Sequence, residues 1–203
     1  MADRDRRSTL ADAYENAATI VSGIGPDVLG HPTPCPDYDV AGLIDHLVEA
    51  GRRAAALGHG QPPPAGDDSP HVAVADAPSE LRAAAHEAAD AWGQDTSLSR
   101  KTTMPWGAEY VGTTLLDMYV AELAAHAWDL AVTTGQVDRL DRSLAAPALQ
   151  GARAWIKPEY RNLVGPGSPF GSEVHLAPDA NGWDRFVAFV GRDPRISFSR
   201  PNT

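Results

Sequence analysis

Three things are scarce in this chain of 203 residues: cysteine, aromatic side chains and long apolar runs. A single cysteine excludes an internal disulfide and is typical of proteins that fold in a reducing cytoplasm. No apolar run approaches the ~20 residues that a membrane-spanning helix needs. The opening residues, MADRDRRSTL, are charged and lack the apolar core of a signal sequence. We therefore expect a cytoplasmic protein with no membrane partner.

Positive charge is also in short supply. Lysine and arginine number 17 against 27 aspartates and glutamates, which gives a formal net charge of −10. This negative field argues against nucleic acid and anionic lipid as partners. Alanine is abundant while Phe and Tyr are few, and such a composition favours closely packed helices over sheets. A hydrophobic share of 43% is ample for the core of one domain, which we expect to span residues 1–203.

Apolar periodicity, capping residues and glycine stops divide the chain into helices and links. We predict helices over residues 8–24, 40–57, 79–93, 112–134, 142–156 and 183–190. The proline- and glycine-rich residues 61–70 and 162–172 are expected to be loops, and residues 98–110 a short extended segment.

The first four predicted helices are joined by mostly short links. This pattern predicts an all-α fold, an antiparallel up-down four-helix bundle, with the extended segment crossing one end. We expect residues 1–136 to form the bundle core and residues 137–203 a small helical extension of the same domain. Side chains on facing helices of such a bundle converge on its interior, which is how metal sites in bundles are built.

The most informative motif is Glu122-Leu-Ala-Ala-His126, in the middle of the longest predicted helix. At this spacing the two side chains lie one turn apart on one helix face. A carboxylate and an imidazole so placed can bind one divalent metal from a rigid element. The pair supplies only two ligands, so a third must come from elsewhere in the chain. Without one, the pair is better explained as a buried ion pair.

His46 is the third ligand that the helical pattern nominates. It lies on the same stripe as Leu43 and Leu47, the core-facing side of its helix. The other histidines are expected at the surface, in loops or on outer helix faces: His31, His59, His71, His86 and His175. A lone inward histidine is more often a hydrogen-bonded core residue, but a second one beside a buried carboxylate, which demands a partner, favours a metal. From the pattern alone, a metal site and a hydrogen-bonded core cluster both stay open.

Four parts of the sequence carry a resemblance to a known family. They are Thr33-Pro-Cys-Pro-Asp-Tyr-Asp-Val40 with Leu43-Ile-Asp-His-Leu47, Met104-Pro-Trp-Gly107, Glu122-Leu-Ala-Ala-His-Ala-Trp-Asp-Leu-Ala131 with Thr134-Gly135, and Phe170-Gly171 with Arg192-Asp-Pro194. Together they extend over nearly the whole chain. The chain resembles the metal-binding domain family of mycothiol-dependent maleylpyruvate isomerases, within the DinB-like superfamily. That family holds its metal with a histidine of the second helix and a glutamate and histidine of the fourth, which implies His46, Glu122 and His126 here.

Three protein ligands would leave positions open for water or substrate, as in catalytic sites. Zinc suits two histidines and a glutamate best, and nickel or iron would also accept them. The resemblance implies that the metal activates a low-molecular-weight thiol, mycothiol, for reaction with a small electrophile. The expected function is therefore a metal- and thiol-dependent transferase or isomerase. A metal-binding or stress module without turnover, and a plain interaction bundle, are the alternatives; a homodimer is a further expectation.

Four more residues are candidates for roles near the site. Arg53 follows His46 by two helical turns, about 10 Å, and is expected to bind an anionic group of the substrate or to lie solvated at the mouth of the bundle. Trp106 is expected either to wall the open end of the cavity, as a substrate contact, or to plug it. Asp129 is expected to pair with an arginine at the surface rather than to steady a metal ligand. Cys35 is expected to be structural, although a helix start can lower the pKa of a thiol.

One departure from the full isomerase bears on the reaction. That enzyme carries an additional C-terminal domain that contributes to its active site, whereas residues 137–203 fit only a compact extension. We therefore expect another substrate than maleylpyruvate. The alanine-, arginine- and proline-rich composition and the resemblance together point to an actinobacterium, in which mycothiol is the usual thiol.

Overall fold

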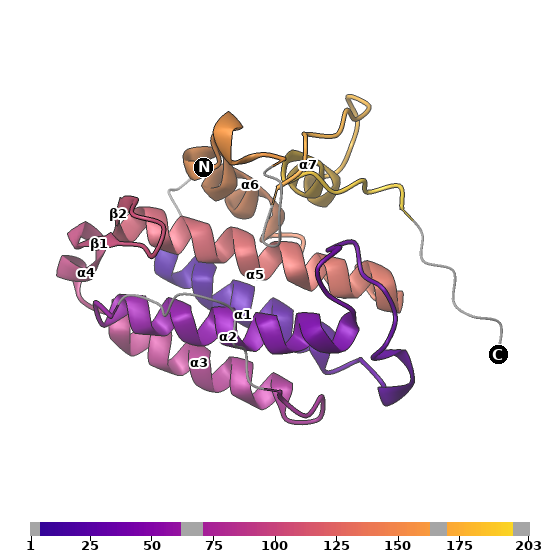
Figure 1. The fold of residues 1–203 in the computed structure, drawn as a ribbon, viewed down its shortest axis with the longest axis horizontal. Helices are drawn as coiled ribbons and strands as arrows, with labels where there is room; N and C mark the ends of the chain where they lie inside the picture. The colour runs from indigo at the N-terminus through magenta and orange to yellow at the C-terminus, as the bar shows by residue number, and fades with distance from the viewer. Residues whose placement is uncertain (1–4, 62–70, 163–169, 197–203) are drawn as a thin grey trace.

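Helices make up most of the structure, a computed structural model that describes residues 5–61, 71–162 and 170–196 (Figure 1). The α-helices in these ranges are α1 (Arg6–Val21), α2 (Val40–Gly58), α3 (Ala77–Trp92), α4 (Asp95–Ser99), α5 (Gly112–Thr134), α6 (Ala145–Trp155) and α7 (Gly182–Phe189). The remaining elements are the strands β1 (Lys101–Thr103) and β2 (Glu109–Val111) and three single 3₁₀ turns, η1 (Pro26–Val28), η2 (Val137–Arg139) and η3 (Pro158–Tyr160). Apart from one small hairpin the fold is all-α, as the composition predicts.

The six predicted helices are found, and their ends follow from local chemistry. The Asp39 carboxylate accepts a hydrogen bond of 2.8 Å from the Gly42 N–H and so caps the start of α2. Gly135 ends α5 in the left-handed conformation, with a φ of 69°, which a glycine adopts without steric cost. Pro78 occupies the first turn of α3, where its missing N–H costs nothing.

Two segments between α3 and α5 differ from the prediction. Residues 95–99 form the short helix α4, and residues 98–110 are not one extended segment. Most of them fold back as the antiparallel hairpin β1–β2, in which Thr102 pairs with Tyr110. Gly107, with a φ of 86°, allows the tight turn between the strands. The loops predicted over residues 61–70 and 162–172 lie for the most part outside the described residues.

The four long helices α1, α2, α3 and α5 pack side by side, and α1 and α2 each lie against both α3 and α5 (Figure 1). The directions of α2 and α3 contradict the strictly antiparallel up-down arrangement. Arg52 pairs with Glu80 at 2.9 Å, and further along both helices Gly58 lies against Ala91, so α2 and α3 run parallel. Helix α2 is about 28 Å long for its 19 residues, and 18 residues of sequence separate it from the start of α3, which is enough chain for a parallel neighbour.

The helices α1 and α5 also run parallel. Arg6 near the start of α1 pairs with Asp117 near the start of α5, at 2.9 Å. At the other end, the Gln136 side-chain amide donates a hydrogen bond to the Ile20 carbonyl. His46 of α2 lies against Glu122 of α5, and Glu49 and Arg53, further along α2, act on Tyr119, which precedes Glu122 on α5. These two helices therefore run in opposite directions, and the candidate site lies between them.

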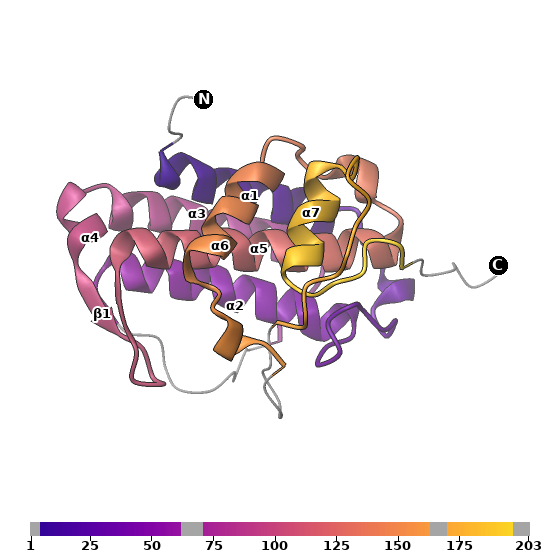
Figure 2. The ribbon, with the colours of Figure 1, turned by 90° about the horizontal axis from the view of Figure 1, so that it is seen from above.

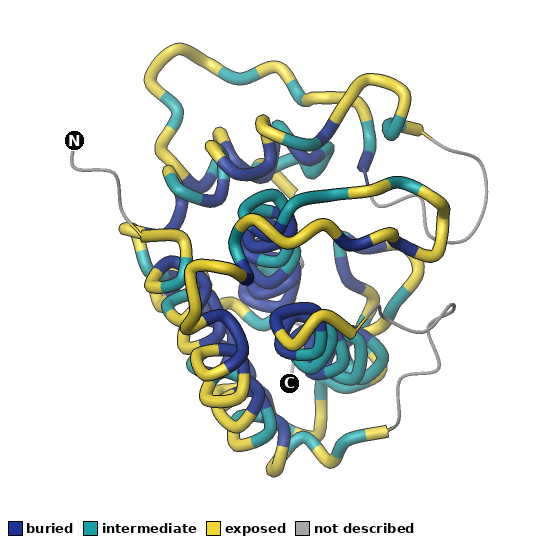
Figure 3. The backbone as a smooth tube through the Cα atoms, turned by 90° about the vertical axis from the view of Figure 1, so that its left-hand side faces the viewer, coloured by how far each residue is buried: buried dark blue, intermediate teal, exposed yellow. Residues whose placement is uncertain are grey.

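The C-terminal extension forms a further layer. Helix α6 packs against α5, and α7 packs against α6 (Figure 2). The faces that the helices turn toward one another are buried, and the outward faces are exposed (Figure 3). Among the described helices, none combines the length and apolarity that a membrane crossing requires.

Candidate metal centre

Two facing helices bring three of the predicted residues together. His46 comes from the middle of α2, and Glu122 and His126 come from successive turns of α5. The Glu122 Oε1 atom lies 3.0 Å from His46 Nε2 and 3.3 Å from His126 Nε2. The two imidazole rings stand nearly perpendicular, with centroids 4.9 Å apart. Both histidines therefore present the same ring nitrogen to one carboxylate oxygen.

The other nitrogen of each ring has its own partner. The Tyr38 hydroxyl lies 3.2 Å from His46 Nδ1, and the two rings stack with centroids 4.8 Å apart. The Asp129 carboxylate lies 3.0 Å from His126 Nδ1. Partners on the outer nitrogen of a histidine orient its ring and determine which nitrogen faces inward. Tyr38 was not predicted to contact the site, because it lies in an irregular link where no periodicity indicates the direction of its side chain.

Charge in the cluster is strongly coupled. Burial would raise the pKa of Glu122, but the neighbouring His126 and His46 outweigh it and hold that pKa well below its usual value. Burial would lower the pKa of His126, but Glu122 and Asp129 raise it to about 9. In the absence of a metal, the geometry thus favours a charged imidazolium between two carboxylates.

The donor set fits a divalent metal. One donor atom from each of His46, Glu122 and His126 lies within 4.8 Å of the other two, so a single ion could reach all three. Two imidazole nitrogens and a carboxylate oxygen form a ligand set that suits zinc and leaves room for a further ligand. Helices hold all three residues, so the donors are positioned by rigid elements. A hydrogen-bonded cluster would use the same contacts, so the geometry by itself fits both alternatives.

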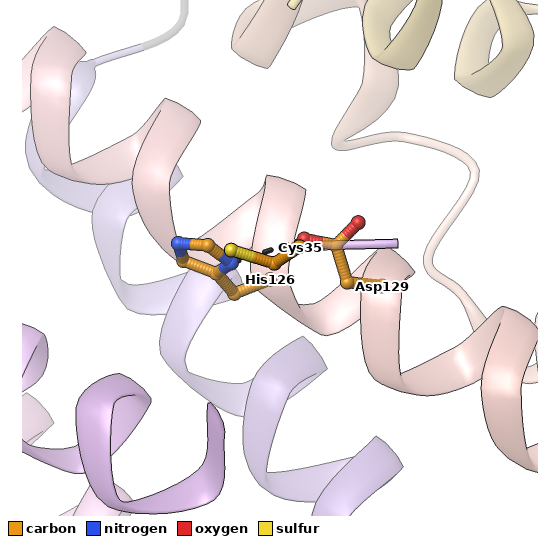
Figure 4. Close-up of side chains that lie close together, drawn as sticks. All are labelled: Cys35, His126 and Asp129. Atoms are coloured by element: carbon orange, nitrogen blue, oxygen red, sulfur yellow. Dashed lines mark hydrogen bonds and ion pairs between the residues drawn. The ribbon is translucent and has the colours of Figure 1, made fainter. Parts of the chain in front are cut away.

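A second group of potential ligands lies on the opposite side of His126. Cys35, His126 and Asp129 also offer donor atoms within 4.8 Å of one another, and all three are buried (Figure 4). Burial raises the pKa of the Cys35 thiol to about 11, although the Arg192 cation lowers it in part. The thiol is therefore protonated at neutral pH, and the helix start does not activate it. This agrees with a structural rather than a nucleophilic cysteine.

For Asp129 the expected arginine partner is present, but the expected surface position is wrong. Asp129 is fully buried rather than at the surface, and its carboxylate contacts both His126 and an arginine, Arg192, at 3.1 Å. Helical spacing around Asp129 does not indicate its burial, because the residue that covers it comes from a distant part of the chain. Arg192 follows α7 and reaches Asp129 across the extension, 63 residues away in sequence. No pattern around Arg192 indicates that it points into the interior.

Arg53 lies on the predicted face of α2, two turns beyond His46. Its Nε atom is 3.1 Å from Glu49 Oε1, and its side chain is only 18% exposed. Arg53 and Glu49 also act on the pKa of Tyr119, which lies one turn before Glu122 on α5. Arg53 is therefore an ion-paired residue close to the α5 face that carries the cluster, rather than a solvated one.

Trp106 is not brought to the cluster. It occupies the turn of the hairpin and is 59% exposed, with its ring tilted against Tyr110 at 6.4 Å. The hairpin ends at Val111, directly before α5, and Glu122 lies about three helical turns, or ~16 Å, further along that helix. With this exposure Trp106 does not plug the end of the helices.

The remaining histidines lie where they were expected, at or near the surface. His31 is partly buried, and the other four are exposed: His59, His71, His86 and His175. His86 is on α3, away from the helix faces that form the cluster.

The fold and the cluster define the class: a mostly helical protein with a candidate metal centre between two of its long helices. The chain belongs to the mycothiol maleylpyruvate isomerase N-terminal domain family, whose model matches residues 10–131. This range contains His46, Glu122 and His126. It ends within α5, so α6, α7 and Arg192 lie outside it.

Relatives of similar length are also found. The chain is 34% identical to the uncharacterized protein MT0763 of Mycobacterium tuberculosis (strain CDC 1551 / Oshkosh) over 187 residues, which covers 90% of this chain and 95% of that protein. The same values hold for the uncharacterized protein Rv0738 of Mycobacterium tuberculosis (strain ATCC 25618 / H37Rv). No solved structure matches the chain.

Proposed function

We propose that the protein binds one divalent metal ion, most suitably zinc, through His46, Glu122 and His126, and that it activates a low-molecular-weight thiol there. Mycothiol is the thiol that the family name indicates. The proposed reaction is transfer of the thiol to a small electrophile, or a thiol-dependent isomerisation. Within this proposal the four long helices form a bundle of the DinB-like kind.

One observation carries the proposal. Two histidines direct Nε2 at the same carboxylate oxygen, while each Nδ1 has its own partner, Tyr38 or Asp129. This is the arrangement found around metal-binding histidines, in which the outer nitrogen is held and the inner one is available. The held outer nitrogens support the proposal because they fix both rings in the orientation that a metal ligand needs.

A bound divalent ion would supply Lewis-acid chemistry that lowers the pKa of a thiol, so that thiolate is available at neutral pH. The residues of the chain supply the remaining functions. The carboxylate of Glu122 would neutralise part of the charge of the metal ion in this partly buried site. Arg53, held by Glu49 on the same helix, is the proposed cation for a carboxylate of the substrate or thiol. Trp106, in the turn of the hairpin, is the proposed aromatic contact for the substrate, because its ring is exposed.

Metal analysis tests the first part of the proposal. Protein purified without a His-tag and loaded with zinc should retain one ion per chain after extensive dialysis. His46→Ala, Glu122→Gln and His126→Ala should each lose it, because two ligands bind far more weakly than three. His86→Ala, which removes an exposed histidine of α3, is the matched control and should retain the ion. Retention of zinc by His46→Ala, or no retention by the unaltered protein, contradicts the proposed site.

Thiol conjugation tests the second part. The zinc-loaded protein is incubated with mycothiol and monochlorobimane, and the fluorescent conjugate is measured against Glu122→Gln. Conjugation above the Glu122→Gln background is expected. A protein that binds zinc but yields no conjugate with mycothiol or other small thiols would instead be a metal-binding module without turnover.

A further inference from the structure

A buried arginine of the C-terminal segment reaches the back of the candidate metal centre. The Arg192 side chain is 9% exposed and Asp129 is 0% exposed. Arg192 Nη2 donates to Asp129 Oδ2 at 3.1 Å, and Arg192 Nε lies 3.4 Å from the other carboxylate oxygen. The same Oδ2 atom accepts from His126 Nδ1 at 3.0 Å. Arg192, Asp129 and His126 therefore form one buried row of charge-assisted hydrogen bonds.

The backbone around Arg192 is held as firmly as its side chain. Helix α7 ends in a Schellman motif, in which the Gly191 N–H bonds to the Ala188 carbonyl and the Arg192 N–H bonds to the Val187 carbonyl. Gly191 adopts a φ of 90°, and an added Cβ would lie 2.5 Å from the backbone of Gly171. Only a glycine permits this close crossing, which directs the next residue toward α5.

The Nδ1 side of His126 is poorly suited to hold a metal of its own. Cys35, His126 and Asp129 lie close enough together, but both oxygens of Asp129 already face the Arg192 guanidinium. A cation bound there would have to lie next to a buried positive charge, which is costly in a medium of low dielectric constant. The contacts of Asp129 on this side therefore serve the ring of His126.

We propose that Asp129 and Arg192 are positioning residues of the metal centre: Arg192 fixes Asp129, and Asp129 holds the His126 ring so that Nε2 faces Glu122 and His46. This inference rests on the proposed function of the cluster. Without Arg192, the carboxylate of Asp129 would be a buried charge paired only with the histidine. Without Asp129, the Nδ1–H would be left unsatisfied and the ring could turn away.

In this proposal the C-terminal extension is part of the metal centre. Arg192 lies outside residues 10–131, which match the family model. The extension is then not an appendage, because it supplies the group that holds the far side of a metal ligand. A chain cut back to residues 10–131 would keep all three ligands but lose this support.

Zinc affinity tests the inference on the full chain. Asp129→Asn and Arg192→Ala should each weaken zinc binding about 10–100-fold in competition with a chelator, as for other partners of metal-binding histidines. The absorption spectrum of the cobalt-loaded protein should change in both variants. Arg192→Lys keeps the positive charge but lacks the planar guanidinium group, so it should recover part of the zinc affinity that Arg192→Ala loses. Arg195→Ala, which removes an exposed arginine paired with Asp193, should bind zinc as the unaltered protein does.

A second measurement does not depend on the metal. In the metal-free protein, the proton on His126 Nδ1 should exchange slowly with solvent in long-range ¹H–¹⁵N spectra, assigned by its loss in His126→Gln. An unprotected Nδ1 proton overturns the inference, and so does zinc affinity in Asp129→Asn and Arg192→Ala equal to that of the unaltered protein. If the unaltered protein binds no zinc, the proposed function fails, while the protected proton still reports the contact with Asp129.

Discussion

At the scale of single residues, the chemistry depends on which partly or fully buried polar groups lie together. Glu122 lies between two histidines, and each histidine has a second partner behind it. Buried polar groups are costly unless they are paired, so such an arrangement persists only when its members satisfy one another. The close pairing of Glu122 with the two histidines therefore explains both the shifted pKa values and the suitability of the cluster for a cation.

The first prediction concerns the pH dependence of the metal-free protein. The pKa of His126 is raised from 6.5 to about 9 in the folded state, so its contribution to stability is full below pH 6.5 and is lost as the pH rises through 9. The free energy of unfolding, measured with urea, should fall across this interval. The fall should be smaller in Glu122→Gln, which lacks the largest cause of the raised pKa. An equal fall in both proteins would contradict the coupling.

The second prediction concerns Cys35. With the pKa raised from 9.0 to about 11, the buried thiol carries about a hundredfold less thiolate at neutral pH than an ordinary cysteine. We expect iodoacetamide to label Cys35 at least that much more slowly in the folded protein than after denaturation. Mass spectrometry of the labelled protein measures both rates. Rapid labelling of the folded protein would mean that Cys35 is accessible and activated.

At the scale of elements, close contacts between helices depend on small residues. Helix α2 lies against α3 where Gly58 meets Ala91 and Trp92, and the Trp92 indole donates to the Ala54 carbonyl at 2.9 Å. This contact fixes the relative register of two parallel helices whose connecting chain is long. Larger residues at these positions would still allow each helix to form, but they would prevent the two helices from packing so closely.

The third prediction is that Gly58→Ala destabilises the fold. An added Cβ would lie 2.7 Å from the Ala91 Cβ and 2.8 Å from the Trp92 indole nitrogen, and neither atom can move freely. Overpacking of this kind costs about 1–3 kcal/mol, which exceeds the gain in helix propensity of about 1 kcal/mol. Urea unfolding measures the loss. Gly30→Ala is the control, because nothing lies within 4 Å of its added Cβ; equal stability of the two variants would contradict the close contact.

At the scale of the whole molecule, the extension and the helices form one unit around the candidate site. Helix α6 packs on α5, α7 packs on α6, and Arg192 returns from the end of α7 to Asp129 on α5. Binding of an ion by α2 and α5 should therefore stabilise the entire described structure rather than one helix pair.

The fourth prediction is thermal stabilisation by zinc. At a free zinc concentration 100 times Kd, binding to the folded state stabilises it by about 2.7 kcal/mol, which corresponds to a rise in Tm of about 5–10 °C for a chain of this size. Calorimetry with and without zinc measures the shift. Glu122→Gln should show a much smaller rise, whereas His86→Ala should behave as the unaltered protein. A similar rise in Glu122→Gln would place the bound zinc elsewhere.

The amino-acid sequence alone indicated the six longer helices and the three clustered residues, although not the short helix α4. Helical hydrogen bonds and side-chain periodicity are local, so the stripe that carries His46 and the one-turn spacing of Glu122 and His126 could be read from the chain. The sequence also indicated where α2 begins, at Asp39, and where α5 ends, at Gly135.

Only the tertiary structure decided the helix directions and the surroundings of the site. The parallel course of α2 and α3 is shown by contacts between the two helices, such as Arg52 with Glu80 and Gly58 with Ala91, which no local pattern records. Asp129 was assigned to the surface because its partner Arg192 is 63 residues away, and Tyr38 reaches His46 from an irregular link. Such contacts form only when the whole chain is packed. An unpaired charge is costly in the interior, so the partner of a buried charged side chain depends on which residues the fold brings near it and not on their spacing in the sequence.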